Sequence, residues 1–98
     1  MIVLFVDQLG QIIATPGALV ALAVAGTSPS TLLRRHAAGD WGDIDAHDRA
    51  ANDAALRDGS RLLSAYIIAE GVKGWIITEA ADADGHRAAT TLLLPEEY

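Results

Sequence analysis

The chain has 98 residues, enough for a single domain and too few for a second hydrophobic core. It contains no cysteine, which excludes disulfides and thiolate metal sites, and we expect a cytoplasmic protein. Thirteen acidic side chains against seven basic ones give a net charge of −6, which disfavours direct binding to the phosphate backbone of nucleic acids.

The N-terminal part of the chain is apolar and predicts one or two short strands within Ile2–Ala14, interrupted at Gly10. No basic residue precedes the apolar start Met1–Val6, which is also too short for a signal peptide. The apolar run Ala18–Ala25 is far shorter than the roughly 20 residues that span a bilayer. We therefore expect no interaction with a membrane.

Two helices are predicted next, each from the same start signal. Thr15-Pro16 combines an N-cap residue with a proline at the first helical position, and Gly26 ends this helix. Ser28-Pro29 repeats the signal for a second helix that ends at Gly39 and has His36 on its apolar side.

A glycine-rich loop and a third helix follow. In the loop Gly39–Asp43 we expect Trp41 to fold inward as a hydrophobic plug. Asp45 is the expected N-cap of a helix over Ala46–Asp58 that Gly59 ends. Acid–base pairs four residues apart are favourable on a helix surface, and this helix offers two of them: Asp45/Arg49 and Asp53/Arg57.

The C-terminal part of the chain changes to strand patterns. Arg61–Ile68, Val72–Glu79 and Ala88–Leu94 are rich in aliphatic, aromatic and threonine side chains, and the turn Asp84-Gly85 precedes the last of them. They predict a three-stranded antiparallel meander. With the helices before it, the chain predicts an α+β fold of one domain, in which short N-terminal strands and three helices precede the meander and the helices pack on one face of the sheet.

His36 is the best candidate for a general base, at the end of the second helix and near Arg34 or Arg35 as a phosphate-binding partner. The other residues of this alternative catalytic site are Tyr66, Thr90 and Thr91. The competing interpretation is a helix-terminal histidine that packs against the sheet and interacts favourably with the helix dipole. We favour it, because no spacing rule connects the four residues.

Other chemistry has no motif in the chain. The three histidines, His36, His47 and His86, do not have the spacing of metal ligands. Asp43, Asp45 and Asp48 lack the glycine and the closing glutamate of a calcium loop. A Gly-x-Ser-x-Gly elbow and a phosphate-binding glycine loop are also absent from the sequence. We expect no metal, no cofactor and no serine hydrolase activity.

The acidic residues are the remaining feature of the sequence. In the region of the third helix and the neighbouring loops they form a candidate partner-binding surface: Asp40, Asp43, Asp45, Asp48, Asp53, Asp82 and Asp84. Closely spaced carboxylates resemble the phosphates of DNA and can compete for a groove lined by lysine and arginine. The alternative is a face that only keeps the protein soluble, because small domains often have a net charge of this size.

Several segments together resemble one family. They are Arg35-His36-Ala37-Ala38-Gly39-Asp40-Trp41-Gly42-Asp43, Leu62-Leu63-Ser64-Ala65-Tyr66, Trp75-Ile76-Ile77-Thr78-Glu79-Ala80 and Thr90-Thr91-Leu92-Leu93-Leu94-Pro95-Glu96-Glu97-Tyr98. The resemblance is to short proteins of plasmids, phages and integrated elements that are often labelled type I restriction subunit M. The turn Ala81–Arg87 is longer and more acidic here than in that family. A chain of this length has no room for a methyltransferase domain.

The resemblance implies two functions of different classes. Small acidic proteins of mobile elements are often anti-CRISPR or antirestriction proteins, which implies a non-enzymatic inhibitor that binds the basic surface of a type I CRISPR–Cas surveillance complex or a restriction enzyme. The order of a helical histidine before strands with Tyr66, Thr90 and Thr91 is also similar to small nucleases of the barnase–EndoU–RelE-like superfamily.

We rank inhibition first, because an acidic ribonuclease would repel its substrate. A third alternative is a structural accessory protein that dimerises through an exposed strand edge, and we expect a monomer or a homodimer.

Overall fold

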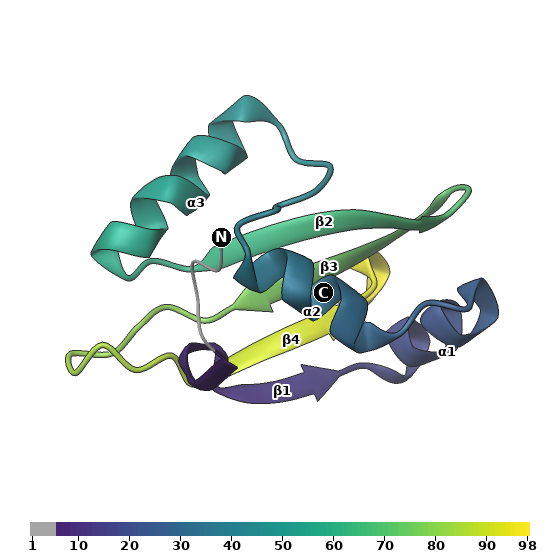
Figure 1. Cartoon of the computed structure of the whole chain (residues 1–98), viewed down its shortest axis with the longest axis horizontal. Coiled ribbons are helices and arrows are strands. Elements are labelled where there is room, and N and C mark those ends of the chain that lie inside the picture. Colours follow the sequence, from purple (N-terminus) through teal and green to yellow (C-terminus); the bar gives the residue numbers. More distant parts are fainter. Residues whose placement is uncertain (1–5) are drawn as a thin grey trace.

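The computed structural model describes residues 6–98 and confirms the α+β class, with three α-helices and a four-stranded sheet (Figure 1). Along the chain the elements are η1 (Val6–Leu9), β1 (Gln11–Ala14), α1 (Pro16–Ala25), α2 (Pro29–Ala37), α3 (Ala46–Asp58), β2 (Leu62–Ala69), β3 (Val72–Thr78), β4 (Ala89–Leu93) and η2 (Pro95–Glu97). The η elements are single 3₁₀ turns.

The strand order in the sheet is β1-β4-β3-β2. The antiparallel meander of β2, β3 and β4 is confirmed, and β1 joins it parallel to β4, a pairing that the sequence did not indicate. The prediction of strand structure before Gly10 is wrong for Val6–Leu9, which forms η1 and delivers the Leu9 side chain to the core. The rest of that predicted strand, Ile2–Phe5, lies outside the described residues.

The predicted helix starts are confirmed in detail. The Thr15 hydroxyl accepts a hydrogen bond from the N–H of Ala18 at 3.3 Å, and the Asp45 carboxylate accepts one from the N–H of Asp48 at 2.7 Å. These side chains satisfy backbone donors that a first helical turn leaves without partners. The helix α2 ends at Ala37, ahead of the predicted end at Gly39.

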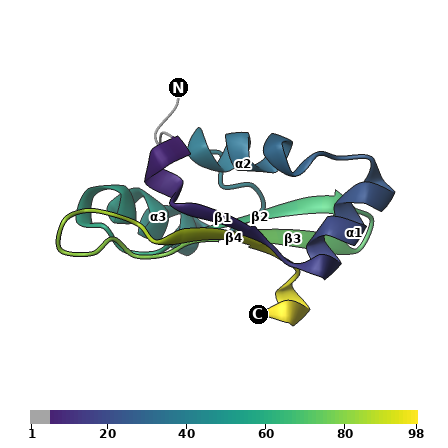
Figure 2. The ribbon, with the colours of Figure 1, turned by 90° about the horizontal axis from the view of Figure 1, so that it is seen from below.

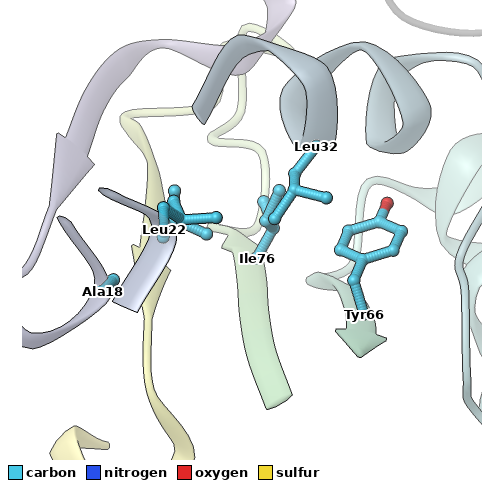
Figure 3. Close-up of a cluster of buried hydrophobic side chains, with 6 residues drawn as sticks. Ala18, Leu22, Leu32, Tyr66 and Ile76 are labelled. Carbon is cyan, nitrogen blue, oxygen red and sulfur yellow. The ribbon is translucent and has the colours of Figure 1, made fainter. Parts of the chain in front are cut away.

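The helices take different positions around the sheet. In the edge-on view of Figure 2, α2 lies over one face, and α1 lies at one end of the sheet. α1 and α2 contribute Ala18, Leu22 and Leu32 to the main core, where these side chains meet Tyr66 and Ile76 of the sheet (Figure 3). The third helix, α3, contacts β2, at the end of the strand order opposite to β1. Of the elements in residues 6–98, η2 and the C-terminus lie beside the other face (Figure 2).

Trp41 belongs to a second buried cluster under α3, and its predicted role as an inward plug is confirmed. The side chain is 2% exposed and packs with Leu9, Ala55 and Leu62. The next residue, Gly42, has φ of 75°, and a Cβ atom there would lie 2.1 Å from the carbonyl oxygen of Ala65. Glycine is therefore required for the loop to approach β2 this closely.

Among the described residues, no single helix combines the length and the apolar character that crossing a membrane requires. Only α1 and α2 taken together pass such a test, and they are bent by 103° relative to each other.

Candidate functional site

His36 lies at the centre of a buried hydrogen-bonded network. Its side chain is 0% exposed and projects from α2 onto the sheet. The Nδ1 atom is 2.5 Å from the Ser64 hydroxyl, and Nε2 is 2.8 Å from the Thr78 hydroxyl. Thr78 bonds in turn to Thr90 at 2.8 Å, and Thr90 donates to the carbonyl oxygen of Leu9 at 2.6 Å. The network thus ties α2 and η1 to three strands.

The Leu9 carbonyl sets the direction of every bond in this network, because it can only accept. Thr90 uses its one hydroxyl proton on Leu9, so Thr78 must donate to Thr90. Thr78 then has no proton for His36, so Nε2 of His36 donates to Thr78. Neutral imidazole has one donor, so Nδ1 accepts from Ser64.

Burial, with a smaller contribution from the positive charge of Arg87, lowers the pKa of His36 to about 4. The ring is therefore neutral at pH 7. A neutral ring has no charge to interact with the helix dipole, whereas the packing interpretation included such an interaction. Both ring nitrogens are bound to hydroxyl groups, and no solvent reaches them. A general base must come within hydrogen-bond distance of its substrate, and His36 as packed here does not.

The other residues of the alternative catalytic site do not join His36 in a pocket. Burial raises the pKa of Tyr66 to about 12, and its hydroxyl donates to the carbonyl oxygen of Asp40 at 2.7 Å. Thr90 is buried in the network, whereas Thr91 points to the opposite face of the sheet, since successive residues of a strand alternate. His36, Tyr66 and Thr90 therefore have structural hydrogen bonds, and Thr91 lies away from them.

Two of the seven acidic residues expected to bind a partner are already paired with an arginine or a lysine, and Asp48 lies 3.6 Å from Nδ1 of its neighbour His47. Asp40 accepts from Nε of Arg35 at 2.6 Å, and this hydrogen bond lowers the pKa of Asp40. Asp43 is 3.0 Å from Nζ of Lys73 in the β2–β3 hairpin. These contacts join the loop to α2 and to the sheet, so the negative charge of both carboxylates is largely balanced.

On α3 the exposed charges alternate in sign. Asp45, Arg49, Asp53 and Arg57 follow one another at intervals of four residues, which places them along one stripe of the helix. Within residues 6–98 the expected pairs Asp45/Arg49 and Asp53/Arg57 come no closer than the 4 Å limit for an ion pair.

Other contacts explain why these pairs do not form. Asp45 caps the helix, Arg49 donates to the carbonyl oxygen of Ile44, and Asp53 accepts a long hydrogen bond, 3.4 Å, from Nε1 of Trp41. The middle of α3 is consequently mixed in charge and not a continuous acidic row.

Negative charge is concentrated instead near two turns of the chain. The carboxylates of Asp45 and Asp48 lie within 4.8 Å of each other at the start of α3, and we call this pair the helix patch. The carboxylates of Asp82 and Asp84 in the β3–β4 connection also lie within 4.8 Å of each other, and we call this pair the loop patch. Backbone hydrogen bonds, first from the N–H of His86, lower the pKa of Asp82.

Each patch has a histidine beside it. Among the described residues, these are the only groups in which histidine and carboxylate ligand atoms are close enough together to hold a metal ion. His47 lies beside the helix patch and His86 beside the loop patch. All six side chains are at least partly exposed. Exposed acidic turns commonly have this spacing without a metal, and Asp45 and Asp82 already accept backbone hydrogen bonds in α3 and in the loop, so we assign no metal to these groups.

Two structurally important side chains were missed from the sequence. Asn52 of α3 is 3% exposed and bonds to both the N–H and the carbonyl oxygen of Leu63, at 3.0 and 2.6 Å. Arg87 donates to the carbonyl oxygens of Ala55, Ser60 and Glu79 and so fastens the end of α3 to the β3–β4 connection. Asn52 interrupts an alanine-rich helix, and this was the one available signal.

An open groove of about 930 Å³ lies between α1, the β2–β3 turn and the C-terminal segment. Its lining is mostly apolar, with Val20, Ile67 and Leu94 among the residues, and Lys73 and Glu96 are its only charged side chains.

Comparison of the chain with protein-family models, with curated proteins and with solved structures finds no match.

Proposed function

We propose that this protein acts by binding and without turnover, as an inhibitor whose acidic surface occupies the basic surface of a nucleic-acid-handling host complex. A type I CRISPR–Cas surveillance complex or a restriction enzyme is the class of target, and the result is loss of DNA binding. The observation that supports this most is the lack of lysine and arginine partners beside the helix and loop patches. Their four carboxylates have no lysine or arginine within 4 Å in residues 6–98.

The basic residues strengthen this contrast, because most of them are engaged within the chain. Arg35 and Lys73 pair with aspartates, and Arg61 donates to the hydroxyl of Tyr98 at 2.8 Å. Arg49 and Arg87 donate to backbone carbonyls. The groups left for an outside partner are therefore mainly carboxylates, which attract a cationic surface and accelerate association with it.

The ribonuclease alternative has less support. His36 is sealed in the core, and Thr91 is on the other side of the sheet from Thr90. A net charge of −6 also repels an RNA substrate.

The test is a competition experiment with purified type I surveillance complex and purified restriction enzyme, each bound to a fluorescent DNA duplex. Two variants each remove two charges, D45N/D48N in the helix patch and D82N/D84N in the loop patch. Asparagine keeps the cap of α3 and the acceptor oxygen in the loop. The matched control, E70Q/E96Q, removes the same charge from exposed residues elsewhere.

We expect the wild type and the control to displace DNA equally from one of these targets. Each patch variant should need about three- to tenfold more protein, on the order of 1 kcal/mol for two partly exposed charges. If the control variant displaced DNA as weakly as the patch variants do, net charge alone would explain the effect. The two patches would then have no specific role in binding. Failure of the wild type with both targets would contradict the proposed target class.

A further inference from the structure

The strand β1 forms one edge of the sheet, and nothing in residues 6–98 covers its outer side. Its inner side bonds to β4: the N–H groups of Gln11 and Thr15 donate to the carbonyl oxygens of Ala88 and Leu92, each at 3.0 Å. Because inward and outward groups alternate along a strand, the N–H and C=O groups of Ile12 and Ala14 point away from the sheet. In Figure 1 no helix or loop lies beyond β1 on that side.

The opposite edge of the sheet is protected. Asn52 satisfies both backbone groups of Leu63, and the loop after α2 bonds to both backbone groups of Ala65, with the N–H to Trp41 at 3.0 Å and the C=O to Asp43 at 2.6 Å. A register shift between Ile67 and Ala69 disturbs the rest of β2. Side-chain caps and bulges of this kind prevent edge-to-edge pairing. Within residues 6–98, one edge of the sheet is thus blocked and the other is open.

The open edge also lacks the charges that normally discourage association. No charged residue occurs between Asp7 and Arg34, a stretch that contains all of β1 and α1. Ile12 and Ile13 are 44% and 41% exposed, and Leu19, Val20 and Val24 of α1 are exposed as well. Exposed, uncharged, β-branched edge strands are ready templates for another strand.

We infer that β1 is a self-association edge, at which a second copy of this chain adds its own β1 in antiparallel register about a twofold axis. In the register centred on Ile13, that residue faces Ile13 of the second copy, and Ile12 faces Ala14 in both directions. The outward groups of Ile12 and Ala14 then form four hydrogen bonds. The product is one continuous eight-stranded sheet with the two β1 strands at its middle.

The placement of charge favours a second copy over a charged partner at this edge. The chain has a net charge of −6, so two copies repel each other in most relative orientations. α3 contacts β2, at the end of the strand order farthest from β1, so pairing through β1 keeps the helix patches of the two copies at opposite ends of the joined sheet. The apolar, uncharged edge thus meets its own copy with the least repulsion.

The experiment measures the mass of the whole chain by sedimentation equilibrium over a range of concentrations, for the wild type and for I13K and I67K. Ile13→Lys places two lysines opposite each other on the twofold axis, where like charges oppose pairing. Ile67→Lys is the matched control, since Ile67 is an exposed isoleucine, 64%, on the blocked edge strand. Circular dichroism verifies that both variants keep the fold.

We expect the wild type and I67K to approach twice the chain mass of 10.3 kDa, and I13K to dimerise at least about tenfold more weakly. Amide exchange locates the contact independently of any variant: Ile12 and Ala14 should become more protected as concentration rises, and Ile67 should not. A wild type that stays monomeric, or a dimer that I67K weakens as much as I13K does, overturns the inference. Higher assemblies without protection at Ile12 and Ala14 also overturn it.

Discussion

Acidification below pH 6.5 should destabilise this protein, and the buried side chain of His36 is the reason. The pKa of His36 is about 4 in the folded chain and 6.5 in a freely solvated histidine. Between these values the unfolded chain binds a proton that the folded chain excludes, so stability falls as the pH falls from 6.5 towards 4. The stability that the neutral His36 ring contributes is fully present above pH 6.5.

The expected loss follows from the size of this difference. One pKa unit corresponds to about 1.4 kcal/mol, so lowering the pH from 6.5 to 4.5 should reduce the free energy of unfolding by about 2 kcal/mol. Single domains have about 5–15 kcal/mol in total. The pKa values of Asp40, Asp58, Asp82 and Glu97 are lowered in the fold, so the stability that they contribute is lost only at lower pH, below their ordinary values of 3.8 to 4.5.

The assay is urea unfolding at several pH values between 7.5 and 4.5, followed by circular dichroism. H36Q should be less stable than the wild type at pH 7 but nearly independent of pH in this range, because glutamine does not titrate. The exposed histidines serve as controls, and H47Q and H86Q should keep the slope of the wild type. An equal slope in H36Q and the wild type would refute the assignment of the acid sensitivity to the buried ring.

The packing and edge contacts make three further predictions for urea unfolding. N52A should lose about 2 kcal/mol, because it leaves the edge of β2 without two hydrogen bonds, and R57A on the exposed side of the same helix should lose much less. L22A should cost about 2–5 kcal/mol by opening a cavity in the main core, whereas V24A, at an 85% exposed position, should stay within about 0.5 kcal/mol. G42A should lose more than about 1 kcal/mol, because alanine is strained at a φ of 75° and its Cβ would meet the backbone of β2; wild-type stability in G42A would show that the loop can move away.

Local signals in the sequence predicted most of the secondary structure. N-cap residues with a following proline placed the starts of α1 and α2, and Asp45 and Gly59 bounded α3 correctly. Each of these boundaries depends on contacts within a few residues, which a single sequence contains. The parallel addition of β1 to β4 depends on residues far apart in the chain, and no local pattern encodes that partnership.

The candidate sites were harder to predict for the same reason. The roles of Ser64 and Thr78 arise only when α2 lies across the sheet and brings His36 between them. Likewise, the pairing of Asp43 with Lys73 required the β2–β3 hairpin to return towards the loop. The sequence showed an excess of acids correctly, but which of them are balanced by bases is a property of the tertiary structure.

The dependence of DNA displacement on salt tests the central proposal most directly, with the wild type and the variant that combines D45N, D48N, D82N and D84N. From about 0.1 M to about 1 M salt the Debye length falls from about 10 Å to about 3 Å, so binding through exposed carboxylates weakens steeply. We expect the wild type to lose its inhibition of DNA binding over this range, and the combined variant to be weak throughout and nearly insensitive to salt. Equal inhibition by both proteins, with the same salt dependence, would contradict recognition through the helix and loop patches.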